Sequence, residues 1–269
     1  MARTDTLNNF LTDVADAIRE KKGTTDTISA SSFDSEIASI ESGSGSEEYF
    51  NTEEKRTYGG ITYYLKTMPI IDFSQYTSLD RYFYYWENLE ELPVLNTSNI
   101  TNFSNCFYGS GIKKFNYMDL SNATNVECFF QGCERLEEIV GMNCVKAPSF
   151  VNLCYACLKL KKVGPINADS CQRCSNIFGR CSEITDFAGL INLGKAYLTS
   201  QSANYADYKL DLSACRKLTH DSLMNIINNL YDIASVGVQP QQLVLGSTNL
   251  ANLTAEEIQI ATNKGWSVS

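Results

Sequence analysis

Two Cys-x-x-Cys pairs are the part of this sequence whose spacing most directly suggests chemistry. Cys154 and Cys157 form the first pair, Cys171 and Cys174 form the second, and 13 residues separate the pairs. Four thiolates at such spacing are typical of a structural zinc site. Cysteine also packs as a small apolar residue. The choice between a zinc centre and four core thiols therefore depends on where the fold places each cysteine.

A single histidine, His220, limits the catalytic arrangements that the chain can build. A Ser-His-Asp or Cys-His site would have to include it, but it stands beside Asp221 at the start of an expected helix, where we expect an exposed side chain. Neither Gly59-Gly60 nor the glycines of 42–48 have the frame of a phosphate-binding loop. No pair of carboxylates is singled out for glycoside hydrolysis. We therefore predict no enzymatic activity, no catalytic residue, no metal and no cofactor.

Tyrosines are the remaining candidates for ligand contact. Tyr84, Tyr108 and Tyr155 hold equivalent positions of the repeat described below, and Tyr85 takes the next position. All four are predicted to face outward. Exposed tyrosines stack on sugar rings and act as hot spots in protein interfaces. The alternative is that they only cover the edge or the N-terminal end of the repeats.

An internal repeat supplies the elements that position these residues. Its central position recurs at steps of 24, 23, 24 and 24 residues and is held by Phe83, Phe107, Phe130, Cys154 and Phe178. Apolar residues also stand four and one places before it and three places after it, which is the spacing of one helix face. Three further apolar positions follow and indicate a strand. Each repeat is therefore predicted to hold a short helix and a short parallel strand, and the stacked repeats to share one core.

The same register decides between the interpretations of the cysteines. Cys154 takes a central position that is otherwise Phe, and Cys174 takes a position held elsewhere by Leu, Phe or Val. Cys157 shares its position with Cys133 and Cys181. The repeat thus favours packed core thiols over a zinc site.

Charged pairs alternate in sign from one repeat to the next. They are Glu90-Glu91, Lys113-Lys114, Glu137-Glu138, Lys161-Lys162 and Thr185-Asp186. Neighbouring strands lie roughly 4.8 Å apart, so stacking would place each lysine pair beside acidic residues, which is favourable by about 0.2–1 kcal/mol per pair. We interpret the pairs as a solvated ladder that fixes the register, with a ligand site as the alternative.

Helical segments are expected on both sides of the repeats. Residues 1–41 predict a small helical module for anchoring and oligomerisation. Its apolar face consists of Leu7, Phe10, Leu11, Val14 and Ile18. A Gly/Ser-rich linker over 42–48 separates this module from a repeat domain over 49–269.

The end of the repeat domain is predicted to consist of capping units. Strands are expected at 210–212 and 243–245, with a helix between them that Thr219 caps. Thr254 and Glu257 have the spacing of a capping box for a last helix that stops at Gly265, and a final short strand follows. Such units close the exposed end of a stack.

Composition limits the partners. The chain has 22 Lys and Arg against 31 Asp and Glu, a net charge of −9. Nucleic acids and anionic lipid surfaces attract cationic proteins, so we predict no nucleic-acid partner and no membrane insertion. No signal peptide follows Met1, so we expect synthesis in a cytoplasm. The ten cysteines should stay thiols there, with disulfides after release into an oxidising medium as an alternative.

The Cys- and Phe-rich units of 23–24 residues resemble BspA-type leucine-rich repeats, found on bacterial surface proteins and in phage proteins. Segment 8–40, which begins Asn-Asn-Phe-Leu-Thr-Asp-Val, resembles a short module at the start of phage and prophage structural proteins. The tail over 243–267 is similar to the closing unit of repeat proteins in the same setting. The resemblance implies an α/β leucine-rich-repeat solenoid in a phage tail, fibre or head fibre, and it brings no catalytic residues.

Three functions follow from these expectations. The favoured one is a non-enzymatic virion protein, in which residues 1–41 bind other virion proteins and the solenoid binds a host-surface glycan or protein. The alternative is a purely structural decoration or assembly protein. A bacterial surface adhesin is a lesser alternative, because a signal peptide and a cell-wall anchor are missing. A homo-oligomer is expected in the virion.

Overall fold

The computed structural model describes residues 56–58, 61–63, 73, 75–92, 95–116, 118–198 and 208–269. The predicted helical module over 1–41, with its face of Leu7, Phe10, Leu11, Val14 and Ile18, lies outside these residues, and so does the linker over 42–48. The first described elements are the strands β1 (Arg56–Tyr58) and β2 (Ile61–Tyr63), which pair antiparallel.

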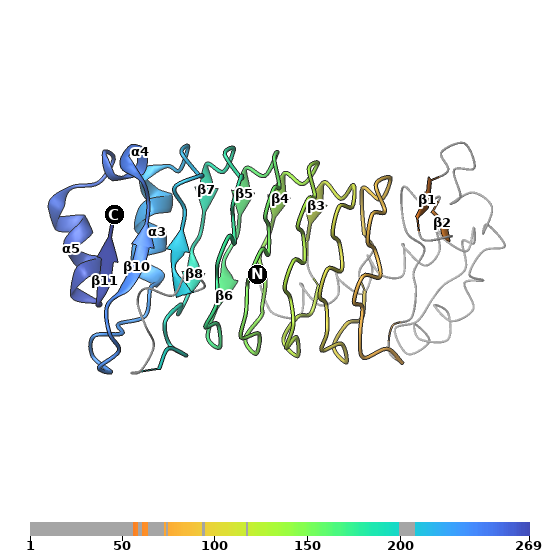
Figure 1. Ribbon diagram of the computed structural model, residues 1–269, viewed down its shortest axis with the longest axis horizontal. Coiled ribbons are helices and arrows are strands. Elements are labelled where there is room, and N and C mark those ends of the chain that lie inside the picture. The colour runs from red at the N-terminus through yellow and green to blue at the C-terminus, as the bar shows by residue number, and fades with distance from the viewer. Residues whose placement is uncertain are drawn as a thin grey trace, which may run out of the picture. The chain divides into compact units, whose positions relative to one another are not determined.

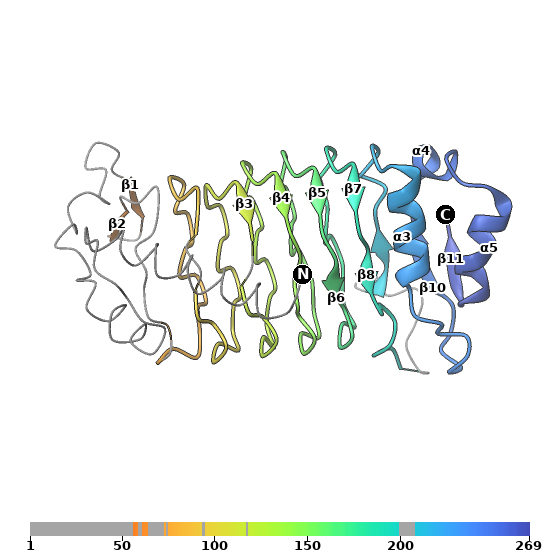
Figure 2. The ribbon, with the colours of Figure 1, turned by 180° about the vertical axis from the view of Figure 1, so that it is seen from behind.

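The described residues form a mixed α/β fold with short parallel strands and few helices. Residues 75–198 form a row of stacked coils (Figures 1 and 2). Strands β3 (Lys114–Phe115), β4 (Glu138–Ile139), β5 (Lys162–Val163) and β7 (Asp186–Phe187) make one parallel sheet in that order. Strands β6 (Ile166–Asn167) and β8 (Leu190–Ile191) make a second parallel pair. Each strand pairs with its equivalent one repeat away, as the repeat predicts.

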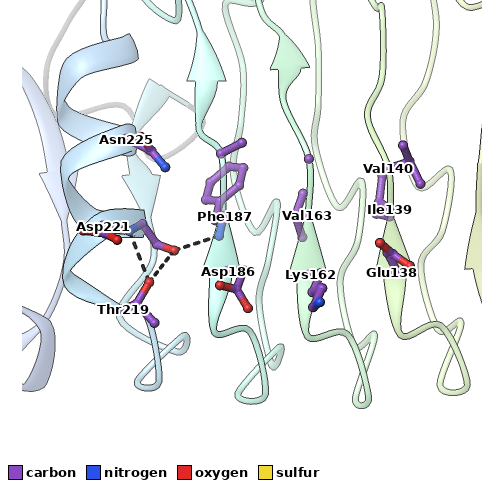
Figure 3. Close-up of a pocket in the computed structure, with 13 residues that line it drawn as sticks. Glu138, Ile139, Val140, Lys162, Val163, Asp186, Phe187, Thr219, Asp221 and Asn225 are labelled. Carbon is purple, nitrogen blue, oxygen red and sulfur yellow. Dashed lines mark hydrogen bonds between the residues drawn. The ribbon is translucent and has the colours of Figure 1, made fainter.

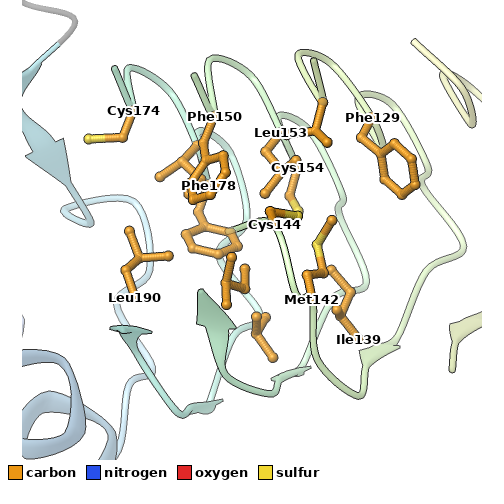
Figure 4. Packing of buried hydrophobic residues seen from close by; sticks show 14 of the residues in the cluster. Phe129, Ile139, Met142, Cys144, Phe150, Leu153, Cys154, Cys174, Phe178 and Leu190 are labelled. Atoms are coloured by element: carbon orange, nitrogen blue, oxygen red, sulfur yellow. The ribbon is translucent and has the colours of Figure 1, made fainter. Parts of the chain in front are cut away.

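The core is built from the repeat positions that the sequence predicts. All five central residues are at most 1% exposed. Phe83 stacks on Phe107 with ring centroids 4.9 Å apart, and Phe107 stacks on Phe130 at 5.8 Å. Figure 4 shows how the same positions of later coils pack side by side, with Cys154 among Phe and Leu side chains. Because burial of one such aromatic side chain is worth about 1.5–3 kcal/mol, this column contributes a large share of the coils' stability.

The predicted short helix in each repeat is wrong. Residues around the central position form consecutive turns instead, because two residues of each coil, two places before and two places after the central one, adopt positive φ. In the coil of Cys154 these are Asn152, with φ 55°, and Ala156, with φ 61°. Left-handed residues at both places stop the series of hydrogen bonds that an α-helix needs. The prediction was right about which side chains face the core and wrong about the backbone that presents them.

Backbone hydrogen bonds in these turns alternate between two directions. The amide of Tyr155 bonds back to the Asn152 oxygen of its own coil at 3.2 Å. The amide of Cys154 bonds to the Ile177 oxygen of the next coil at 2.9 Å. The same alternation recurs at the equivalent residues of the other coils, so each coil is joined to its neighbours by backbone bonds on the turn side as well as on the strand side.

The C-terminal region over 208–269 has longer elements than the coils. It contains strands β9 (Leu210–Asp211), β10 (Gln241–Val244) and β11 (Trp266–Val268), and helices α3 (His220–Asn229), α4 (Ser247–Leu250) and α5 (Ala255–Asn263). The strands form a parallel sheet in the order β11-β10-β9. Of these elements only α4, a single turn of four residues, has no counterpart in the sequence predictions.

The predicted helix signals are confirmed in this region. Thr219 caps α3 and accepts a hydrogen bond from the Ser222 amide. Thr254 and Glu257 form the capping box of α5. Gly265 follows α5 with φ 89°, a conformation in which glycine carries no steric cost, and β11 begins directly after it.

Helix α3 lies beside β7, where another coil would otherwise pair. The Ser222 hydroxyl accepts a hydrogen bond from the Phe187 amide at 2.9 Å and donates one to the Thr185 oxygen at 3.1 Å. Asn229 donates its side-chain amide to the Ala188 oxygen at 2.8 Å. Hydrogen bonds from two side chains of α3 therefore replace the backbone hydrogen bonds of a further strand at this edge of the sheet.

Candidate ligand-binding site

Three of the four predicted contact tyrosines lie together on the turn side of the first coils. The Tyr84 ring stacks on Tyr108 with centroids 4.9 Å apart and meets Tyr85 edge to face at 4.6 Å. Tyr85 also contacts Tyr108 at 5.5 Å. All three are half-buried rather than fully outward-facing, because each ring lies against a neighbour instead of extending into solvent. Aromatic pairs of this geometry add about 0.5–1.5 kcal/mol beyond burial, so the rings are held in fixed orientations.

Tyr155 does not join this cluster. It holds the position of Tyr108 two coils further on, and Gln131 occupies the coil between them, with its side-chain amide 3.5 Å from the Tyr108 hydroxyl. The Tyr155 ring lies over Gly179, where a Cβ would be only 2.8 Å from its Cδ2 atom. The structure thus separates Tyr155 from the other three predicted residues.

A groove of about 470 Å³ opens beside Tyr85. Its floor is formed by Gly109 and Gly132, which stand two places after the central position with φ of 65° and 74°. Equivalent positions elsewhere carry the side chains of Tyr85, Ala156 and Arg180. The Tyr85 ring takes the space where a Gly109 side chain would stand, whereas the space at Gly132 is open, so the groove lies between the ring and the next coil.

Polar side chains form the rim of this groove. Glu87, Asn88, Glu134 and Arg135 line it. Arg135 is held by an ion pair with Glu90, whose other carboxylate oxygen lies 2.8 Å from the Lys113 ammonium. The hydrogen bond from Lys113 and the pairing with Arg135 lower the pKa of Glu90 below its ordinary value, against an opposing effect of burial. The rim thus carries fixed charges of both signs around a short polar trough.

A second hollow, of about 420 Å³, lies where the parallel sheet meets α3. Figure 3 shows Phe187, Val163 and Ile139 side by side on β7, β5 and β4, with Asp221 and Asn225 on the helix beside Phe187. Neither hollow was predicted from the sequence. The glycines two places after the central position were a usable signal for the first hollow, whereas the second depends on how α3 packs.

The predicted charge ladder is confirmed on the sheet. Lys114, Glu138, Lys162 and Asp186 stand opposite one another in register. The Lys114 ammonium lies 2.8 Å from Glu138, and that of Lys161 lies 3.2 Å from Glu137. A hydrogen bond from Lys114 lowers the pKa of Glu138. Since these groups are exposed, each pair stabilises the fold only slightly.

The four cysteines of the Cys-x-x-Cys pairs are buried thiols in the core, as the repeat predicts. Cys133, Cys157 and Cys181 hold one position in successive coils, and each thiol donates to a carbonyl oxygen of the preceding coil at 2.9–3.1 Å. Burial raises the pKa of Cys133 to about 12. Among the described residues no group of three or more His, Cys, Asp or Glu side chains is arranged to hold a metal ion. These thiols therefore act as packing groups.

His220 is exposed at the first residue of α3, as predicted, and its Nε2 atom lies 2.9 Å from the Glu257 carboxylate of α5. Among the described residues, His220 contacts the carboxylates of Asp221 and Glu257. In the part of the chain that the structure describes, no helix is long and apolar enough to cross a membrane.

Comparisons of this chain with protein-family models, with curated proteins and with solved structures give no match. The geometry of the tyrosine cluster and of the groove beside it is therefore the basis on which a function is assigned.

Proposed function

We propose that this chain is a non-enzymatic phage virion protein whose leucine-rich-repeat solenoid recognises a host-surface glycan or protein. The observation that carries this proposal is the stacked cluster of Tyr84, Tyr85 and Tyr108 beside a groove with a glycine floor. Rigid aromatic side chains bind at little cost in conformational entropy. A cluster of them next to a preformed hollow is typical of a ligand-binding surface.

Several features support the finer assignment of the fold. Units of 23–24 residues, one parallel strand per unit and a continuous core of equivalent apolar residues are properties of leucine-rich-repeat solenoids. The turns that replace the predicted helices still place the same residues in the core. The C-terminal region, with α3 on the edge of β7, fits the role of a closing cap.

The virion part of the proposal depends on the resemblance of segment 8–40 to phage structural modules. In this scheme residues 1–41 attach the chain to other virion proteins and bring copies together as a homo-oligomer. Several copies would present several solenoids to one cell surface, which raises the apparent affinity of weak individual sites.

The test is binding of the full-length protein to intact cells of candidate host strains. Tyr84→Ala/Tyr85→Ala removes two rings of the cluster, and Tyr76→Ala removes a 42% exposed tyrosine outside it as a matched control. We expect saturable binding to permissive cells that the double variant loses and the control keeps. Absence of binding to every permissive strain would contradict receptor recognition.

A specific observation favours the structural alternative, a decoration or assembly protein. Val140 is 50% exposed and lies between the hollow at α3 and a third hollow lined mainly by apolar groups, including Met118, Met142 and Pro165. Apolar surface of this kind suits a contact with another protein. Val140→Asp should then impair incorporation into particles while leaving cell binding unchanged.

A further inference from the structure

We propose that the groove beside Tyr85 binds a neutral sugar ring of a host-surface glycan, rather than a peptide or an acidic sugar. This inference rests on the proposed function and makes it narrower, since it names the ligand class and the part of the surface that receives it. The wall, the floor and the rim of the groove each favour such a ring.

The wall is the Tyr85 ring, which its neighbours hold in place. Tyr84 and Tyr108 contact it at 4.6 and 5.5 Å between ring centroids. The ring lies so close to Gly109 that a Cβ there would be 2.7 Å from its Cδ1 and Cε1 atoms. A fixed aromatic face beside open space suits the C–H-bearing face of a pyranose, which is flat and weakly apolar while its edge is polar.

The floor sets the length of the groove. Gly109 and Gly132 are successive, and the next coil has Ala156 at the same position. Coils lie roughly 4.8 Å apart, so the floor spans a short saccharide. Gly111 also lines the groove, and it packs so closely on the preceding coil that a Cβ would stand 1.8 Å from the Glu87 oxygen.

The rim argues for a glycan over a peptide. Among the described residues, Tyr85 is the one aromatic or aliphatic side chain that lines the groove, and the remaining lining is glycine, serine and polar or charged side chains. Peptide anchors are held mainly by apolar pockets. A carboxylate such as Glu134 accepts hydrogen bonds from hydroxyl groups, and Asn88 and Arg135 donate them. This set matches the hydroxyl edge of a sugar.

Charge decides between neutral and acidic sugars. Glu87 and Glu134 line the groove, and the guanidinium of Arg135 is paired with Glu90. Carboxylates thus outnumber cations around the groove. A uronic or sialic acid would bring a third carboxylate toward two others, which is unfavourable in a partly desolvated site. A neutral hexose or N-acetylhexosamine avoids this repulsion.

Two substitutions at one repeat position provide the test. Gly132→Asn fills the groove floor, and Arg180→Asn places the same side chain two coils further on, outside the groove. Both positions have positive φ, 74° and 65°, which asparagine tolerates better than most residues. The Gly132 site is also open, since the nearest atoms to an added Cβ are 3.7 Å away. Equal thermal midpoints of the two variants would show that both are folded.

The probes are neutral hexose and N-acetylhexosamine oligosaccharides and their uronic-acid and sialylated counterparts, titrated into the full-length protein by NMR. We expect binding of a neutral probe, at least a tenfold weaker affinity with Gly132→Asn and with Tyr85→Ala, and unchanged affinity with Arg180→Asn. Failure of every neutral probe to bind, preference for an acidic probe, or full binding by Gly132→Asn would each overturn the inference.

Cell binding separates this inference from the proposed function. If Gly132→Asn still binds host cells as well as wild type, receptor recognition stands and the groove is not its site. If the groove binds a neutral saccharide but the wild-type protein binds no permissive cell, the groove assignment stands and the proposed function fails.

Discussion

The coils over 75–198 and the C-terminal region over 208–269 satisfy their backbones in different ways. In the coils, amides such as that of Phe107 donate to the neighbouring coil, here to the Phe129 oxygen at 2.9 Å. In the C-terminal region, α3 and α5 satisfy most of their own backbone groups and use Thr219 and Thr254 as caps. The comparison indicates that the stability of a coil is shared with its neighbours, whereas that of the cap helices is largely local.

The largest expected effect tests this sharing in the coils. Phe107→Ala removes a fully buried ring that stacks on Phe83 and Phe130 in the two adjacent coils. We expect a loss of about 3–5 kcal/mol in the free energy of unfolding, from lost burial and the cavity that remains. Chemical denaturation measures this loss. Leu198→Ala is the control, because the Leu198 side chain is 58% exposed. A loss below about 1 kcal/mol would contradict a core shared between coils.

A smaller effect is expected where two coils approach most closely. Gly111→Ala would place a Cβ 1.8 Å from the Glu87 oxygen of the preceding coil, so the backbone has to shift. We expect a cost of about 1–3 kcal/mol. Gly141→Ala is the control, because neither glycine has a left-handed φ and the Cβ added at Gly141 would stand 3.2 Å from its nearest neighbour, the Pro165 oxygen. Equal thermal midpoints for the two variants would show that coil spacing is not limiting.

The loss of stability from removing a helix cap should be smaller than these two effects and confined to the helix. Thr254→Ala removes the side-chain acceptor for the Glu257 amide at the start of α5. The expected cost is about 1 kcal/mol, with Thr254→Ser restoring most of it. Hydrogen exchange should increase in α5 and remain unchanged around Phe83 and Phe107. Increased exchange in those coils would contradict the contrast between shared and local stability.

The smallest effect is the pH dependence that Glu90 contributes. Its pKa lies below the ordinary value because Lys113 and Arg135 stabilise the carboxylate. The stabilisation is therefore fully present above the ordinary pKa and is lost as the pH falls through the lower pKa of the folded state. Below about pH 5, Glu90→Gln should lose less stability than wild type does. Urea midpoints across this pH range measure the difference in stability between the variant and wild type. Glu256→Gln, at an exposed glutamate, is the control. If the midpoints of Glu90→Gln and wild type fall in parallel with pH, Glu90 does not contribute the pH dependence.

The sequence was sufficient to predict burial in the coils because each position is repeated five times. One cysteine at a central position is ambiguous, but Cys154 among four phenylalanines is not. The strand pairing was predictable for the same reason, since Lys114 and Glu138 can be opposite each other only in one register. The caps Thr219 and Thr254 were predictable because their signals depend on a few adjacent residues.

The turns and the groove were beyond the predictions because they depend on backbone conformation. The spacing of core residues around Phe107 is the same on a helix face and on a series of turns. The discriminating signal was the recurrence of Asn105 and Asn152 two places before the central position, with Gly109 and Gly132 two places after it. These residue types tolerate positive φ. The half-buried state of Tyr85 could not be predicted, because it depends on contacts with Tyr84 and Tyr108.

The alternating hydrogen bonds of the turns have an electrostatic consequence for the whole wall that they form. Between the first two coils, the amides of Leu79, Arg81, Phe83 and Tyr85 all donate toward the later coil, and the equivalent residues repeat this direction along the stack. Their peptide dipoles therefore add, as they do along a helix, with the positive end toward the C-terminus and the negative end at the first coils. The Tyr85 groove lies near that negative end. On the turn side this row of dipoles opposes anions, whereas the amides of Gly111 and Lys113 on the strand side donate toward the earlier coil and have the opposite direction. The backbone thus gives the two sides of a coil opposite polarity, which no side-chain substitution removes.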